Sequence, residues 1–341
     1  MIKKRIVAGA LGACLAVAAL TGCSGTKDSS NAAADEPLTV KNCGVETKFT
    51  THPKKVVSMG VTGLAYLFAA GAEKSIVGRA NEWGEEPPSW IGKKADGIKV
   101  LSTESISMEA LMKLKPDLAY GGGFSSKTTA PKAVAEKGIP AVVDATECNY
   151  FYPDQKSDES FDTTLAEITQ LGKIMGTSEK ADATVKELKE KLEQISNEKI
   201  GKDRKVSYAY YYGEDADLFS YGNKGVMGEI NKTLNLVSAI DPNYHPHQGP
   251  IAPEAFVKSD PDVIILLTGM GGATKESSMQ RLEKIPGFKD MKAVKNGNII
   301  YAESAVAYAS PTAIYGTFEL ADQLKNCLLY TSPSPRDATL S

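Results

Sequence analysis

The sequence has 341 residues and a formal net charge of −3, with 39 basic and 42 acidic side chains mixed along it. Neither composition nor charge points to a nucleic-acid partner, because no polybasic stretch stands out. At this length a single hydrophobic core is unusual, and two domains of about 130 to 150 residues are the expected arrangement.

The N-terminus has the parts of a bacterial export signal. Basic residues at 3–5 precede an apolar run over 6–19, which is shorter than the ~20 residues that span a bilayer. Residues 20–23, Leu-Thr-Gly-Cys, resemble the lipobox, in which the cysteine is diacylated and becomes the first mature residue. We therefore expect a signal peptide over 1–22, lipid on Cys23 and an extracytoplasmic protein anchored to the bacterial cell membrane. The alternative is an ordinary signal with an incidental cysteine.

The next segment is small and polar. Residues 24–36 contain no large apolar side chain, so they cannot bury enough surface to fold. We predict that residues 23–37 form a flexible tether between the lipid and the folded part of the protein.

Residues 38–161 alternate between short apolar runs and helical patterns. Strands are predicted at 55–60, 76–80, 117–120 and 139–144, because these runs are rich in β-branched or apolar residues and bounded by Gly, Pro or Asp. Helices lie between them, so the pattern predicts an α/β lobe with a mostly parallel sheet.

Two helices are predicted over the connecting segment 162–200. The first runs from 162 to 175, and the second from 177 or 178 to about 198, a length of roughly 30 Å. The second is either an ordinary surface helix or a rod that bridges two lobes. We favour the rod, because α/β patterning resumes directly afterwards and predicts a second lobe over 201–326.

An internal repeat supports two similar lobes. Residues 109–118 (EALMKLKPDL) and 254–263 (EAFVKSDPDV) share Glu, Ala, Lys, Pro and Asp in register. Each copy predicts a helix opened by Glu and stopped by Pro-Asp, followed by a buried strand. A cleft is expected between such lobes.

The C-terminus needs separate treatment. Residues 327–341 resemble one reading frame of a sequencing adapter, and we expect them to be an artefact; a natural Ser/Pro-rich tail is the alternative. If they are an artefact, the second lobe is truncated after Asn326. We would then expect exposed apolar surface near Leu320 and Leu324.

The cysteines can be divided by these predictions. Cys14 belongs to the signal, Cys23 takes the lipid and Cys327 lies in the suspected artefact. Cys43 and Cys148 remain, and in an oxidising compartment they suggest one disulfide. Two free buried thiols are the alternative.

Taken together, these features resemble the helical-backbone class of solute-binding proteins, which serve ABC importers for ferric siderophores, haem and cobalamin. The resemblance covers about 40–326. It rests on the lipobox, the tether, the long helix and the Pro-Asp units, and on Val-Val-Ser at 56–58, residues 287–298 and Ser-Pro at 310–311.

The resemblance implies two Rossmann-like lobes with mostly parallel sheets, joined by a single long α-helix, with a ligand cleft between them. It implies a monomer without an intrinsic cofactor that binds a chelated iron compound, a ferric siderophore, with cobalamin or haem as alternatives. The implied partners are an ABC permease and its ATPase, and the implied contact with the membrane is the lipid anchor.

Particular residues follow from the same resemblance. In relatives, an exposed glutamate in each lobe pairs with permease arginines, and these positions correspond to Glu109 and Glu254. The alternative is that each glutamate only stabilises its own helix N-terminus. Asn-Cys-Gly at 42–44, with Cys148, resembles a subgroup in which these cysteines pair.

Ligand contacts are expected in loops that follow the strands, the usual site in open α/β sheets. Aromatic residues would suit a planar or catecholate ligand. His245 and His247 could ligate a metal, but loop polarity explains them equally well, and we assign no firm metal ligand. The candidate ligand-binding residues are Thr62, Trp83, Glu104, Phe124, Tyr212, Tyr221, His245, His247 and Tyr308.

Other classes of protein are less well supported. The sequence contains no Gly-x-Ser-x-Gly, P-loop or His-Glu-x-x-His motif, so we do not expect an enzyme. A cell-surface adhesion lipoprotein would lack a concave surface between the lobes.

Overall fold

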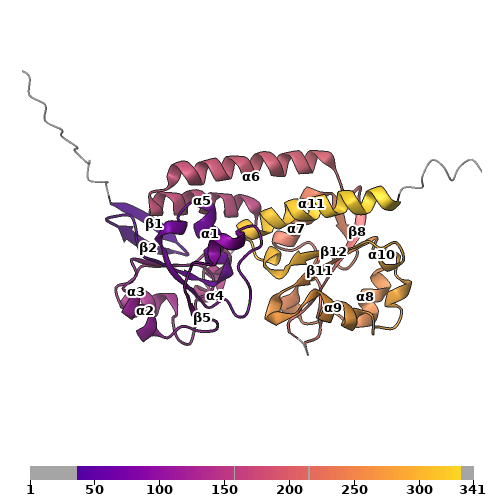
Figure 1. Cartoon of the computed structure of the whole chain (residues 1–341), viewed down its shortest axis with the longest axis horizontal. Helices are drawn as coiled ribbons and strands as arrows, with labels where there is room; N and C mark the ends of the chain where they lie inside the picture. Colours follow the sequence, from indigo (N-terminus) through magenta and orange to yellow (C-terminus); the bar gives the residue numbers. More distant parts are fainter. Residues whose placement is uncertain (1–36, 157, 214–215, 332–341) are drawn as a thin grey trace, which may run out of the picture. The chain divides into compact units, whose positions relative to one another are not determined.

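The computed structural model describes residues 37–156, 158–213 and 216–331 (Figure 1). The predicted signal peptide, the lipid site at Cys23 and most of the tether lie outside these residues. Within the described ranges, no helix is long and apolar enough to cross a membrane.

The first lobe begins with an antiparallel hairpin and continues as a five-stranded sheet in which all pairs are parallel. The hairpin is formed by β1 (Leu38–Asn42) and β2 (Val45–Phe49). The sheet has the order β5-β4-β3-β6-β7, formed by β3 (Val56–Met59), β4 (Ile76–Ala80), β5 (Val100–Ser102), β6 (Leu118–Tyr120) and β7 (Ala141–Val142). Its helices are α1 (Gly60–Ala69), α2 (Met108–Leu114), α3 (Pro131–Glu136), α4 (Cys148–Phe151) and α5 (Phe161–Met175).

The second lobe has a mixed sheet. Its parallel strands have the order β10-β8-β11-β12, and β9 pairs antiparallel with β8. The strands are β8 (Arg204–Tyr211), β9 (Leu218–Phe219), β10 (Leu236–Ser238), β11 (Val263–Thr268) and β12 (Ile299–Glu303). The helices are α7 (Val226–Leu234), α8 (Pro253–Ser259), α9 (Lys275–Leu282), α10 (Lys292–Lys295) and α11 (Pro311–Thr331).

The aspartate of the repeated Pro-Asp unit makes the same kind of hydrogen bond in both lobes. The carboxylate of Asp117 accepts the backbone N–H of Lys55 at 3.0 Å, and that of Asp262 accepts the N–H of Lys205 at 2.9 Å. Each aspartate thus ties its own strand, β6 or β11, to the beginning of the neighbouring strand, β3 or β8. The two lobes are therefore built on equivalent strand pairs, as the repeat predicted.

The helices α2 and α8 precede these aspartates and place their glutamates similarly. Ser107 caps α2 by accepting the N–H of Ala110 at 3.2 Å, and Pro253 opens α8. Glu109 and Glu254 both lie exposed in the first helical turn, where the helix dipole favours a carboxylate.

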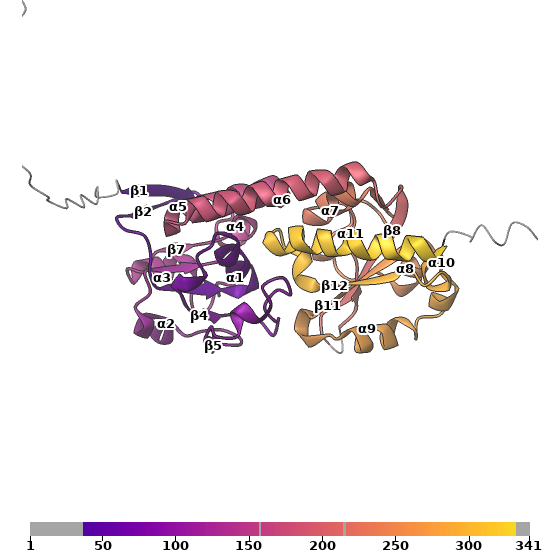
Figure 2. The same ribbon diagram turned by 45° about the horizontal axis from the view of Figure 1, so that its top comes forward.

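The long helix α6 (Ser178–Glu198) contacts α5 of the first lobe and α7 and α11 of the second (Figures 1 and 2). The other predicted connecting helix, α5, belongs to the first lobe, where it packs against α1 and its Glu167 accepts a hydrogen bond from Tyr120, but it also contacts α11 of the second lobe. One hydrophobic cluster continues from the first sheet, through these helices, to the second sheet. The lobes therefore share part of their core.

The last helix departs from one expectation. The prediction of exposed apolar surface near Leu320 and Leu324 was wrong, because both side chains are 0% exposed. Helix α11 packs against α6, α7 and β12, and these contacts cover its apolar face. The helix continues from the second lobe into residues 327–331, within the segment predicted to be an artefact.

Candidate functional site

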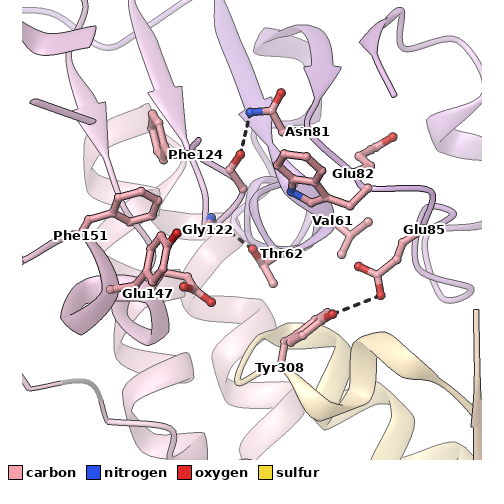
Figure 3. Close-up of a pocket in the computed structure, with 14 residues that line it drawn as sticks. Val61, Thr62, Asn81, Glu82, Glu85, Gly122, Phe124, Glu147, Phe151 and Tyr308 are labelled. Carbon is pink, nitrogen blue, oxygen red and sulfur yellow. Dashed lines mark hydrogen bonds between the residues drawn. The ribbon is translucent and has the colours of Figure 1, made fainter. Parts of the chain in front are cut away.

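A cavity of about 310 Å³ lies at the carboxyl edge of the first sheet (Figure 3). The order of this sheet reverses between β3 and β6, so the chain segments after these two strands diverge and leave a crevice. Residues after β3, β4 and β6 line the cavity, together with residues of α4 and one residue of the second lobe. The lining residues are Gly60, Val61, Thr62, Asn81, Glu82, Trp83, Glu85, Gly122, Gly123, Phe124, Glu147, Tyr150, Phe151 and Tyr308.

Glycines allow the beginning of α1, directly after β3, and the loop after β6 to pack backbone against backbone. Gly60 has a φ of +79°, and a Cβ there would press on Gly123. Gly121 has a φ of +135°, and a Cβ there would collide with the carbonyl of Met59. The close approach brings Thr62 and Phe124 to the same cavity.

The loop after β4 presents Trp83. Asn81 is fully buried, and its side chain donates to the carbonyl of Gly123 at 2.8 Å and accepts the N–H of Ile106 at 2.7 Å. Asn81 and Trp83 both have positive φ values, +59° and +54°. These hydrogen bonds hold the loop in an uncommon conformation. The Trp83 side chain remains 44% exposed and forms one wall of the cavity.

Helix α4 forms another wall, and a disulfide fixes where it begins. Cys148, its first residue, is bonded to Cys43 in the turn between β1 and β2, with a Cα–Cα distance of 5.2 Å. The predicted pairing is confirmed. Glu147 lies immediately before the bridged cysteine, and Tyr150 and Phe151 follow it along the cavity wall. The disulfide therefore supports a wall of the cavity as well as the fold.

The second lobe contributes Tyr308 to the cavity. Its hydroxyl donates to Oε1 of Glu85 at 3.4 Å (Figure 3). Oγ of Ser304 donates to the same oxygen at 2.9 Å. Nearby, the hydroxyl of Ser89 donates to Glu303 at 3.0 Å. These bonds join the two lobes beside the cavity.

The carboxyl groups in the cavity have shifted acidities. Burial raises the pKa of Glu85 to about 7; the hydrogen bonds from Ser304 and Tyr308 oppose this, and the charge of Glu303 adds to it. Burial, together with the charges of the Asp144 and Glu159 carboxylates, raises the pKa of Glu147 to about 7. Desolvation penalises the charged form of each group in the absence of a nearby cation.

A buried polar network supports the base of the cavity. The hydroxyl of Thr62 donates to Asp144 at 2.6 Å, and the hydroxyl of Tyr120 donates to Glu167 at 2.7 Å. The backbone N–H of Ala145 donates to the other Glu167 oxygen at 2.9 Å. This network links α1, β6 and α5 to the segment that leads to Glu147.

The structure brings four of the predicted ligand residues together at this cavity: Thr62, Trp83, Phe124 and Tyr308. Glu104 does not line it, because it follows the edge strand β5, away from the crevice between β3 and β6. Tyr212 is 59% exposed and is not a lining residue. Tyr221 is buried and stacks on Tyr210 with ring centroids 5.3 Å apart, so it is a packing residue of the second lobe.

The histidines line a different cavity. The rings of His245 and His247 lie 4.3 Å apart, centroid to centroid, near Glu159 and Glu229. No group of three or more His, Cys, Asp or Glu side chains among the described residues is arranged to hold a metal ion. Burial lowers the pKa of His245, and the neighbouring His247 lowers it further.

Sequence reasoning missed the acidic part of the cavity. Glu82, Glu85 and Glu147 were not predicted, and neither were Tyr150 and Phe151 of α4. Glu82 is the second residue after the predicted strand 76–80, so its position in the chain could have identified it as a candidate. Glu85 and Glu147 carried no such signal, because only the tertiary fold turns them towards the cavity.

Comparisons with known proteins agree with this architecture. The Periplasmic binding protein family matches residues 56–306. Bacillus subtilis YvrC, an uncharacterized ABC transporter substrate-binding lipoprotein, is 24% identical over 321 residues, which cover 91% of this chain and 94% of YvrC. The petrobactin-binding protein YclQ of the same organism is 22% identical over 325 residues, 92% of this chain and 96% of YclQ.

Solved structures share the fold. The YclQ crystal structure has a TM-score of 0.67 at 20% identity and is matched over 88% of this chain and all of YclQ. A protein of an Fe³⁺-hydroxamate transport system from Saccharomonospora viridis has a TM-score of 0.67 at 21% identity, over 84% of this chain and 98% of that protein. The chain belongs to the periplasmic binding protein family, and the predicted two-lobed α/β fold is confirmed.

Proposed function

We propose that this protein captures a chelated ferric ion in the cavity between β3, β6, α4 and Tyr308, and delivers it to an ABC permease. The observation that carries the proposal is the cavity itself. It lies at the switch point of a parallel sheet, and five aromatic side chains line it. These residues are Trp83, Phe124, Tyr150, Phe151 and Tyr308.

The relatives support the same class of cargo. YclQ is named for petrobactin, and the Saccharomonospora viridis protein for Fe³⁺-hydroxamate transport. Iron is cargo in this proposal, and the chelator supplies its ligands. A cavity lined by aromatic rings and a few polar groups suits a chelate of this kind.

Delivery would use the exposed glutamates and the lipid anchor. Glu109 and Glu254 occupy equivalent positions in the two lobes, so a two-fold permease could grip one carboxylate on each. Lipid on Cys23 would keep the protein beside the permease and its ATPase. The shared core through α6 and α11 would restrict closure of the lobes, so release would depend on strain imposed by docking.

Tryptophan fluorescence tests the proposed cargo. The sequence has two tryptophans; Trp83 lines the cavity, whereas Trp90 stacks on Tyr315 at 4.2 Å and lies outside it. In a Trp90→Phe variant, a ferric siderophore should quench Trp83 saturably, with haem and cobalamin titrated as the alternative cargoes. A Trp83→Phe variant that keeps Trp90 controls for optical absorption. The proposal fails if none of the ligands binds the metal-free, purified protein.

A further inference from the structure

The cavity is acidic and aromatic, and this combination restricts the charge of its ligand. Three carboxyl side chains line it, those of Glu82, Glu85 and Glu147, and its lining includes no Lys, Arg or His. An adjoining cavity shares Glu85 and adds Glu86 and Glu303, again without a basic lining residue. An anionic ligand would find no basic side chain in either lining to compensate its charge.

One of the three carboxylates is neutralised by the protein, and two are not. Glu82 pairs with Nη1 of Arg79 at 2.5 Å, and both side chains are largely buried. Among the described residues, the side chain of Glu85 accepts hydrogen bonds from two neutral hydroxyls, those of Ser304 and Tyr308. Neither Glu85 nor Glu147 forms an ion pair with a basic side chain in the described part of the chain. A ligand can therefore bind to the carboxyl groups of Glu85 and Glu147, because no basic side chain of the described residues neutralises them.

The aromatic walls provide an independent reason to expect a cation. Trp83 is 44% exposed and Tyr150 is 62% exposed, so both present open ring surface at the cavity, although the Tyr150 ring also contacts Phe151 edge to face. The face of an aromatic ring attracts ammonium groups, and Trp is the strongest partner. In Figure 3, Glu147 and Glu85 lie on either side of Thr62, with Tyr308 beside Glu85. Carboxylates and ring faces together form a receptor for an alkylammonium group.

We propose that the cavity selects a ferric tris-hydroxamate that carries a protonated amine, and that the ammonium group binds between Glu147 and Glu85. This inference rests on the proposed function. Three hydroxamates neutralise a ferric ion, so such a chelate is neutral at the metal and positive at the amine. Ferric tris-catecholates are multiply anionic, and haem carries two carboxylates, so both would be repelled by the same residues.

Paired titrations test the selectivity. The probes are ferric desferrioxamine B, which has one free amine, its N-acetylated ferric complex, which differs only in lacking that charge, and a ferric tris-catecholate. We expect the amine form to bind at least about tenfold more tightly than the acetylated form, which corresponds to roughly 1.4 kcal/mol. Glu147→Gln and Glu85→Gln should each reduce this ratio, whereas Glu136→Gln, an exposed change on α3, should not.

The outcomes separate the two proposals. A ratio near one for the amine and acetylated forms, or tighter binding of the catecholate, would overturn the selectivity and leave chelate binding intact. No binding of any chelate would overturn both. A reduced ratio in the glutamine variants, with unchanged thermal unfolding, would support the assigned ammonium position.

Discussion

The hydroxyl of Ser304 donates a hydrogen bond of 2.9 Å to Glu85. A buried residue of the second lobe therefore influences the protonation of a carboxyl group that lines the cavity. This bond favours the ionised form of Glu85, whereas burial favours the protonated form and raises the pKa to about 7. The protonation of the cavity is therefore coupled to contact between the lobes.

The first prediction concerns pH. A cationic chelate should bind more tightly as pH rises from 6 to 8, because Glu85 and Glu147 ionise across this range and the cation favours their charged forms. The groups that face Glu85 are Glu82, Glu303, Ser304 and Tyr308, and those that face Glu147 are Asp144 and Glu159. In Ser304→Ala the midpoint of this change should move to higher pH, since a hydrogen bond to the carboxylate is lost.

Calorimetric titrations at several pH values measure this effect. The N-acetylated chelate is the matched control and should show a weaker dependence on pH. Affinity that falls with rising pH for the amine form would contradict the prediction.

The second prediction concerns the disulfide. It closes a loop with a sequence separation of 105, so a Cys43→Ala/Cys148→Ala variant should lose roughly 3 to 5 kcal/mol in free energy of unfolding. Ligand affinity should also fall, because the start of α4 carries Glu147 and Tyr150. Intact mass of the wild-type protein should be two hydrogens below that of the reduced chain. Unchanged affinity in the folded variant would show that the bridge does not position the cavity wall.

The third prediction separates docking from ligand capture. Glu109→Lys and Glu254→Lys should together abolish uptake in cells and leave chelate affinity unchanged, because both residues are exposed and lie outside the cavity. Each single variant should reduce uptake to an intermediate level if the permease binds both lobes. Lys substitution at the exposed Glu136 is the control for surface charge. Lost ligand affinity, or normal uptake in the double variant, would contradict the docking role.

The fourth prediction concerns stability. Burial, with a smaller contribution from the charge of Asp144, raises the pKa of Glu167 to about 8, so the folded protein keeps a proton that the unfolded chain releases above about pH 4.5. The stabilisation is complete below that pH and is lost as pH rises through 8. Glu85, Glu147 and Asp144 act in the same direction.

Urea unfolding between pH 5 and 8.5 should therefore show decreasing stability. Glu167→Gln should show a shallower decrease, because its amide resembles the protonated acid and does not titrate. The same slope in both proteins would mean that Glu167 is ionised throughout.

The sequence predicted those features that depend on local pattern. The Pro-Asp repeat identified the paired strands of both lobes, and the apolar run at β3 placed the beginning of α1, which contains Thr62. Two cysteines left over from targeting segments suggested the correct disulfide. The strand and helix predictions rest on residues that are neighbours in the sequence. The disulfide prediction rests on counting the cysteines that have no other assigned role.

The sequence did not predict correctly which side chains line the cavity where tertiary geometry decides their position. Tyr221 follows a strand, like Tyr308, but its strand is the antiparallel β9, and its ring packs onto Tyr210. Glu104 follows an edge strand. Glu147 could not be identified, because its position depends on a disulfide partner 105 residues from Cys148. Strand order and tertiary packing decide which loops meet, and neither is a local property.

Anomalous scattering from bound iron tests the central claim most directly. Crystals of the mature protein with ferric desferrioxamine B should show one anomalous peak in the cavity, between Trp83, Glu147 and Tyr308, with the free amine between Glu147 and Glu85. A peak in the second cavity beside His245 and His247, or no ordered iron at a saturating chelate concentration, would contradict the account.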